Sequence, residues 1–191
     1  MKKIFQVSSV ALIAASSLIY SCQKETETAS TEKLEPQKCL QDKKGSSNTL
    51  STTPYNVYLY EIKSNEDGTY TWEWRVRNLN PGNGNNGTVQ DLSHWGITLG
   101  ECIKPENIVS GATSTNGTSW TPFTPEFKKD PSQNCYNENI IKFDVGTSGT
   151  NISYYRLTIN KNVSHTGVTG IYKSGNRTGC GTLETCGFGC E

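Results

Sequence analysis

From residue 55 onward, apolar and polar side chains alternate along the chain. In 70–77, the Tyr, Trp and Val side chains occupy every second position and Thr, Glu and Arg lie between them. This period of two is typical of a β-strand with one face in a core and the other in solvent. Residues 55–62 are aromatic or aliphatic on both faces, which predicts a strand covered on both sides. Asp67-Gly68 between the two segments predicts a hairpin turn.

Later segments repeat this pattern between clusters of Gly, Asn, Ser and Thr. The expected strands include 97–99, 141–145, 155–159 and 168–173, and only 105–109 could form a single helical turn. Short strands separated by turn clusters favour an antiparallel β-sandwich of about seven or eight strands. We expect this all-β domain to span 54–191, with a partly open β-barrel as the alternative. Two long segments, 80–90 and 111–139, are expected to be loops.

The amino-terminal segment 1–21 begins with Met-Lys-Lys, continues with an apolar stretch and ends at Ser21, directly before Cys22. Such a sequence is typical of a secretory signal peptide. With a cysteine at the cleavage point, it resembles the lipobox of bacterial lipoproteins, which implies a diacylglyceryl group on Cys22. The alternative is an ordinary signal peptide in which Cys22 has no special role.

The residues after Cys22 carry the resemblance further. Gln-Lys-Glu-Thr-Glu at 23–27 is similar to the Lys-plus-acidic tract of Bacteroidota surface lipoproteins. This resemblance implies an outer-membrane protein, lipid-anchored and exposed at the cell surface. Residues 23–53 hold ten charged side chains among 31 and no aromatic residue. They cannot bury enough apolar surface to fold alone, so 22–53 is predicted to be a flexible tether.

The charge balance limits the possible partners. The chain has 18 basic and 18 acidic side chains, and removal of 1–21 takes away only Lys2 and Lys3. A nearly neutral protein has no basic face for phosphates, so no nucleic-acid partner is expected. After the leader, no apolar run is long enough to span a bilayer. The expected membrane contact is therefore the lipid anchor.

Six cysteines remain once Cys22 is assigned to the lipid, and an even number in an exported chain predicts disulfides. They are Cys39, Cys102, Cys135, Cys180, Cys186 and Cys190. We expect Cys102 to pair with Cys135, because both lie beside loop-rich segments, and Cys39 to pair with one of the last three. A metal cluster is not expected, because the spacings of these three differ from those of zinc knuckles and no His is nearby.

Candidate catalytic residues are few. Asp91-Leu92-Ser93-His94-Trp95 contains Asp, Ser and His, but the members of a catalytic triad come from separate elements. We therefore expect His94 and Trp95 to fix a corner of the fold through packing and one hydrogen bond. A glycosidase would need two nearby carboxylates, and the available acids are Glu73, Asp91, Glu101 and Asp144. No cofactor is expected, although the Asn-rich loop 80–90 and Asp91 could offer oxygen ligands to calcium.

Aromatic residues in the long loop are the best candidates for ligand binding. Trp120 and Phe123 lie among Thr, Ser and Pro, and a tryptophan beside hydroxyl and amide groups suits a sugar. Asn83 and Asn85 in the other loop could add hydrogen bonds to the same ligand. Alternatively, Trp120 holds its own loop against the sandwich. The aromatic side chains of Tyr70, Trp72 and Trp74 are expected to lie in the core.

Three functions are compatible with these features. The first is a surface lipoprotein that acts as a non-catalytic binding or adhesion module for a glycan or for a host or matrix protein. The second is a hydrolase that depends on carboxylates. The third is a structural or inhibitory surface protein. The first is favoured because no motif for a nucleophile, metal or nucleotide is present, whereas long loops with aromatic residues are.

Overall fold

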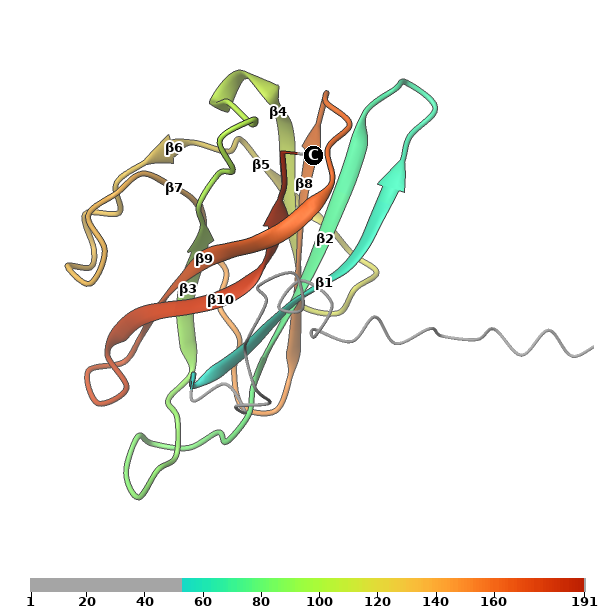
Figure 1. The fold of residues 1–191 in the computed structure, drawn as a ribbon. Helices are drawn as coiled ribbons and strands as arrows, with labels where there is room; N and C mark the ends of the chain where they lie inside the picture. The colour runs from blue at the N-terminus through green and yellow to red at the C-terminus, as the bar shows by residue number, and fades with distance from the viewer. Residues whose placement is uncertain (1–52, 191) are drawn as a thin grey trace, which may run out of the picture. The chain divides into compact units, whose positions relative to one another are not determined.

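The computed structural model describes residues 53–190, which form two antiparallel β-sheets of five strands each (Figure 1). The strands are β1 (Tyr55–Ser64), β2 (Tyr70–Asn78), β3 (Leu92–Ile97), β4 (Ile108–Ser114), β5 (Thr121–Phe123), β6 (Phe127–Lys128), β7 (Ile140–Phe143), β8 (Ile152–Ile159), β9 (His165–Ser174) and β10 (Cys180–Phe188). A 3-10 helix, η1 (Pro105–Asn107), precedes β4. No helix within 53–190 has the length and apolar character to cross a membrane.

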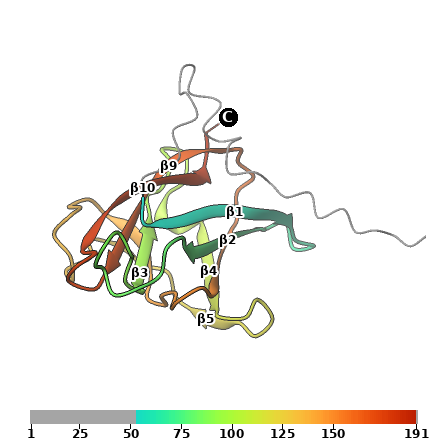
Figure 2. The ribbon, with the colours of Figure 1, turned by 90° about the horizontal axis from the view of Figure 1, so that it is seen from below.

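The two sheets pack face to face as a β-sandwich, which confirms the predicted fold class. The first sheet has the order β1-β2-β8-β4-β5, and the second has the order β10-β9-β3-β7-β6. Figures 1 and 2 show them as two layers. Eight of the strands have four residues or more; β5 and β6 are shorter and lie in 111–139. Part of β4 also falls in this segment, so the expectation that 111–139 is entirely a loop was wrong.

The hairpin predicted at Asp67-Gly68 joins β1 to β2. Gly68 has a φ of 80° and donates its backbone N–H to the Asn65 carbonyl at 3.1 Å. The prediction that β1 is covered on both faces was wrong, because only one face of the first sheet packs against the second. Tyr58 and Tyr60 remain partly exposed on the outer face, and a register shift at Leu59/Glu61 interrupts the ladder at Tyr60.

The core lies between the sheets and is aromatic. Trp72 and Trp74 of β2 are fully buried, as predicted, whereas Tyr70 packs at the margin. Trp72 lies 4.6 Å from the Phe188 ring of β10, and Trp74 lies edge-on to Trp95 of β3 at 6.4 Å, measured between ring centroids. These contacts join the two sheets, and aromatic pairs of this geometry each contribute roughly 0.5–1.5 kcal/mol beyond burial.

The predicted disulfide between Cys102 and Cys135 was wrong. Cys102 is bonded to Cys190, and Cys135 is bonded to Cys180, with Cα separations of 5.2 and 5.9 Å. The strands β3 and β10 both pair antiparallel with β9, so they run in the same direction and the residues after them share one end. Sequence position alone could not show this. Cys186 is also disulfide-bonded, whereas Cys22, Cys39 and the predicted tether lie outside the described residues.

Candidate functional site

Trp120, the principal candidate from the sequence, lies on the outer face of the first sheet. It follows β4, and its ring is stacked on the Arg156 guanidinium, whose carbon is 3.6 Å from the ring centroid. The same ring lies edge-on to Tyr154, with 6.4 Å between centroids. Arg156 and Tyr154 belong to β8, two positions apart on the outward face. Trp120 thus covers the neighbouring strand and stays partly exposed.

A buried carboxylate lies at the centre of this face. Glu73 of β2 is directly opposite Arg156 in the register, and its side chain is 5% exposed. Arg156 donates from Nε and Nη2 to Glu73 Oε2 at 2.9 and 2.7 Å. Arg75, two residues along β2, donates from Nε to Glu73 Oε1 at 3.1 Å. One carboxylate therefore holds two guanidinium groups, and opposite charges facing each other across strands stabilise the sheet.

Arg75 is fixed by aromatic rings as well. Its guanidinium carbon lies 3.1 Å from the centroid of Tyr60 and 5.0 Å from that of Tyr154. The register shift in β1 places Tyr60 over this arginine. Although burial opposes it, the Glu73 carboxylate raises the pKa of Arg75 above its ordinary value. We call the whole group the arginine face; its members are Tyr60, Glu73, Arg75, Trp120, Tyr154 and Arg156.

The other predicted ligand residues have partners of their own. Phe123 of β5 lies edge-on to Phe143 at 5.8 Å and packs against Gly111, so it holds β5 to the core. Asn83 Oδ1 accepts a hydrogen bond from the Asn85 N–H at 3.0 Å, and the Asn83 carbonyl accepts one from Arg177 at 3.3 Å. These contacts are separate from those of Trp120, and their ligand roles stay predictions.

The calcium prediction concerns the same loop. The Asp91 carboxylate accepts a hydrogen bond from the Gly149 N–H at 2.8 Å, and the Asn78 side-chain oxygen accepts one from the Asn80 N–H at 3.0 Å. These two oxygens, which flank the loop, thus accept hydrogen bonds from backbone donors. Within 53–190, no group of three His, Cys, Asp or Glu side chains is placed to hold a metal ion.

His94 of β3 belongs to a second group, which surrounds a buried carboxylate beside the other sheet. Its Nε2 lies 2.7 Å from Asp130 Oδ2, and the Asp130 side chain is 1% exposed. The second oxygen, Oδ1, accepts hydrogen bonds from the Ser132 hydroxyl at 2.7 Å and backbone N–H at 3.0 Å. Lys142 lies 3.3 Å from Oδ1 and 2.8 Å from Asp144. We call His94, Asp130, Ser132 and Lys142 the closed cluster.

The closed cluster supports the structural interpretation of His94. Ser93 lies 3.3 Å from His94 Nδ1, so Ser93, His94 and Asp130 follow one another as in a triad. Ser93 and His94 are, however, consecutive residues of β3, whereas the members of a catalytic triad come from separate elements. Burial and the Lys142 charge lower the pKa of His94 despite Asp130. The Ser132 and His94 hydrogen bonds outweigh burial and lower the pKa of Asp130 to about 2.

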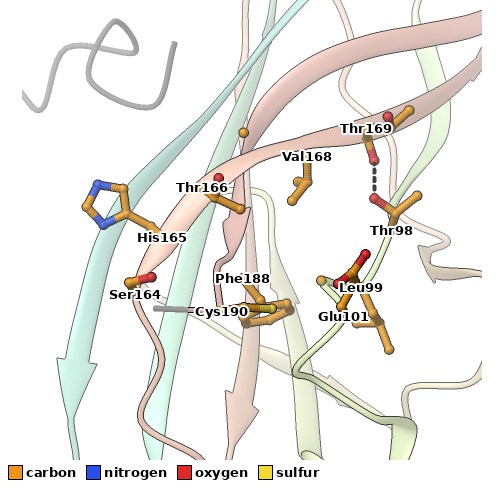
Figure 3. Close-up of a pocket in the computed structure, with 12 residues that line it drawn as sticks. Thr98, Leu99, Glu101, Ser164, His165, Thr166, Val168, Thr169, Phe188 and Cys190 are labelled. Carbon is orange, nitrogen blue, oxygen red and sulfur yellow. Dashed lines mark hydrogen bonds between the residues drawn. The ribbon is translucent and has the colours of Figure 1, made fainter. Parts of the chain in front are cut away.

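A polar hollow of about 760 Å³ lies where β9 begins and β10 ends (Figure 3). Its lining includes Thr98, Glu101, His165 and Thr169, and the Cys102–Cys190 disulfide borders it. The Thr98 hydroxyl donates to the Thr169 carbonyl at 3.2 Å. The aromatic ring in the lining, Phe188, is fully buried. Ligand pockets combine open apolar surface with a few convergent polar groups; in this hollow the one Phe ring is buried, whereas the rings of Tyr60, Trp120 and Tyr154 on the arginine face are partly exposed.

Sequence reasoning missed several members of these two groups. Asp130 and Ser132 lie in the long segment before β7, and nothing in their spacing indicates His94 as a partner. Glu73 and Arg156 are separated by 83 residues and meet only through the β2–β8 register. Alternation did indicate that both point away from the core. The outward Tyr60 was overlooked because its strand was expected to be covered.

Comparison with known proteins identifies no relative. No protein family matches the chain, and no curated protein is similar to it. A solved structure of a GH20 exo-β-N-acetylglucosaminidase from Vibrio harveyi, in complex with N-acetylglucosamine, aligns with a TM-score of 0.35 at 11% identity. The alignment covers 70% of this chain but 18% of that enzyme. Similarity at this level is evidence of neither a shared fold nor a shared function.

Proposed function

We propose that this chain is a surface lipoprotein that binds glycans, without catalysis, on the arginine face. The observation that carries the proposal is the outward aromatic array held by Glu73. Arg156 and Arg75 are fixed by this carboxylate, and Trp120, Tyr60 and Tyr154 are fixed against the two guanidinium groups. The array is partly exposed on a sheet whose other face already forms the core.

Sugars suit such a surface for two reasons. The C–H face of a sugar ring packs on an aromatic side chain, and its hydroxyl groups accept hydrogen bonds from nearby donors. A guanidinium has five N–H donors, and the bonds from Arg75 and Arg156 to Glu73 involve only a minority of them. Since the side chains are held in place before binding, little conformational entropy is lost when the ligand arrives.

The membrane anchor is part of the proposal. Cys22 would carry the lipid, and the Lys-plus-acidic tract at 23–27 would direct the protein to the outer face of the outer membrane. Each buried methylene contributes roughly 0.8 kcal/mol, so several acyl chains suffice for stable anchoring. Cys22→Ser should release the protein from the membrane fraction. If the variant stays there and no fatty acid is found on the wild-type sulfur, the anchor is wrong.

The tether would be fastened to the sandwich by Cys39. Of the three terminal cysteines expected as its partner, Cys180 and Cys190 are bonded elsewhere, which leaves Cys186. Cys186 is itself disulfide-bonded. A Cys39–Cys186 bond would hold the tether against β10, the edge strand of the second sheet. Peptide mapping without reduction should recover the two cysteines in one linked fragment; a Cys39 thiol that reacts with an alkylating agent would contradict this.

The binding function can be tested with a glycan array. Full-length protein purified in detergent should bind a subset of glycans, and Trp120→Ala should abolish that binding because it removes the ring stacked on Arg156. Tyr136→Ala, a partly exposed aromatic in the segment before β7, is the matched control and should bind as wild type does. Equal binding by Trp120→Ala and wild type would exclude this face, and binding to matrix proteins alone would exclude glycans.

A further inference from the structure

We infer that the arginine face selects acidic glycans, with a carboxylate or sulfate group of the sugar bound across the guanidinium edges of Arg75 and Arg156. This inference rests on the proposed glycan-binding function and names the class of glycan. It is carried by three observations: the local charge, the number of donors, and the way in which both arginines are held.

The arginine face carries a net positive charge, unlike the chain as a whole. Glu73 can neutralise only one of the two guanidinium groups that it binds. Along the outward positions of β1, β2 and β8, four cationic side chains face two carboxylates: Lys63, Arg75, Arg77 and Arg156 against Glu61 and Glu73. The formal net charge of the whole chain is zero. Positive charge is therefore concentrated on the face that also carries the aromatic rings.

The donor geometry suits a planar or tetrahedral anion. Arg75 donates to Glu73 through Nε, which leaves N–H donors of its terminal nitrogens for another acceptor. Arg156 uses Nε and Nη2 on one oxygen, so Nη1 points elsewhere. The side chains of Arg75 and Arg156 are 23% and 36% exposed. Guanidinium groups bind carboxylate and sulfate-like anions through pairs of N–H donors, and such charged hydrogen bonds are stronger than neutral ones.

A purely structural role explains only part of this arrangement. One arginine opposite Glu73 would complete the cross-strand pair, and Arg156 already occupies that position. Arg75 adds a second, partly exposed charge that Glu73 cannot balance alone. Its guanidinium is nevertheless held on Tyr60 and close to Tyr154, as is Arg156 on Trp120. The two cations are held rigidly and are incompletely neutralised. A bound anion would neutralise the remaining positive charge.

The test measures binding of three polysaccharides of matched length to full-length protein in detergent. The probes are polygalacturonate, which is carboxylated, dextran sulfate, which is sulfated, and neutral dextran; poly-glutamate serves as an acidic polymer without sugar. Wild type should bind at least one acidic polysaccharide about tenfold more tightly than neutral dextran, since an anion adds charged hydrogen bonds. Added NaCl should weaken this binding. The two acidic probes distinguish a carboxylate from a sulfate ligand.

Variants assign the preference to the two arginines. Arg156→Gln should lower acidic binding about tenfold and leave any neutral binding unchanged. Arg75→Lys keeps the charge but loses the paired donors, so it should lose part of the preference even if Arg156→Gln folds poorly. Lys129→Gln removes an exposed charge on the other sheet and should have no effect. A Lys129→Gln loss equal to that of Arg156→Gln would overturn the inference.

Each further outcome separates this inference from the function on which it rests. If the protein binds neutral and acidic glycans equally, and Trp120→Ala abolishes both, the acidic preference is overturned and the glycan-binding function stands. Poly-glutamate bound as tightly as the acidic sugars would point to an acidic peptide and overturn both. Absence of binding to every probe and to the glycan array would also overturn both.

Discussion

Two buried carboxylates, one in a strand of the first sheet and one beside the second sheet, bind cations in different ways. Glu73 on the first sheet and Asp130 near the second have side chains that are 5% and 1% exposed. Both are neutralised by cations and hydrogen-bond donors. The partners of Asp130 are His94, Ser132 and Lys142, and they come from β3, β7 and the segment just before β7.

The closed cluster and the arginine face differ in the contacts that the remaining N–H donors of these partners make. In the closed cluster, His94 is buried and Lys142 also binds Asp144, so the charges satisfy one another. On the arginine face, the two guanidinium groups extend past Glu73 to solvent and carry aromatic rings. A closed group adds stability and fixes the segment before β7 in place. An open one supplies a surface that a ligand can complete, and it should contribute less to stability.

The largest expected effects follow removal of a disulfide. One of them, Cys135–Cys180, ties the segment containing Asp130 to the start of β10. The double variant Cys135→Ala/Cys180→Ala should lose about 3–4 kcal/mol of unfolding free energy, because the bond closes a loop of 45 residues. Urea unfolding measures the loss. The His94 imidazole NMR signals should also shift. Cys102→Ala/Cys190→Ala is the control: its bond closes a loop of 88 residues, so its loss should destabilise the fold at least as much without shifting these signals.

Substitution of the two buried acids, Asp130 and Glu73, should have the next largest effect on the unfolding free energy. Asp130→Asn should cost roughly 2–4 kcal/mol, because it leaves the His94 and Ser132 donors without their charged acceptor and Lys142 with Asp144 alone. Glu73→Gln should cost about 1 kcal/mol, because Arg75 and Arg156 can turn to water. Both values come from urea unfolding of otherwise identical proteins. A larger cost for Glu73→Gln than for Asp130→Asn would reverse the comparison.

The pH dependence of stability should come from the closed cluster. Burial and Lys142 lower the pKa of His94 from 6.5, so the unfolded chain binds a proton first and stability falls as the pH drops below about 6.5. The pKa of Asp130 is lowered from 3.8 to about 2, so a further loss of roughly 2 kcal/mol is expected between those pH values.

Unfolding free energies measured from pH 8 to pH 2 would detect both steps. His94→Gln should remove the loss of stability below about pH 6.5, and Asp130→Asn should remove the loss between pH 3.8 and about 2. Glu73→Gln should retain both. Stability that rises on acidification below pH 6.5 in the wild type would contradict the assignment of these shifts.

An effect on stability as small as that of Glu73→Gln is expected for Trp120→Ala. The ring is partly exposed and packs on Arg156 and Tyr154, so its loss should cost about 1 kcal/mol. Glycan binding should nevertheless be lost. Phe123→Ala should have the opposite pattern of effects, because Phe123 packs on Phe143 and Gly111. It should cost more stability and leave binding largely intact; loss of binding in the Phe123 variant alone would move the site.

The sequence predicted the sandwich because burial on one face imposes a period of two. Trp72 and Trp74 follow that rule, and so does the turn at Gly68. Strand β10 (Cys180–Phe188) was not predicted, since Gly and Thr at several of its positions weaken the alternation. Strand β4 was hidden for a similar reason: Gly111, Ala112 and Thr113 are too small to mark a face.

The candidate site was less predictable than the fold. Trp120 stood out because a large ring in a polar segment is unusual, but its partners come from strands far away in the sequence. Arg75 and Arg156 were recognised only as part of the polar side of two strands, and Glu73 was in addition one of several candidate carboxylates. Their meeting depends on the register between β2 and β8, and a shift of one residue would turn every side chain to the other face. Composition and alternation cannot fix such a register.

The most direct test is a titration of ¹⁵N-labelled full-length protein in detergent with an oligogalacturonate, followed through the backbone amide and Trp side-chain NMR signals. We predict that the shifted signals cluster on the arginine face, at Trp120 and along the outward positions of β2 and β8. Shifts confined to the hollow between Thr98 and His165, or no shift at saturating sugar, would contradict the account.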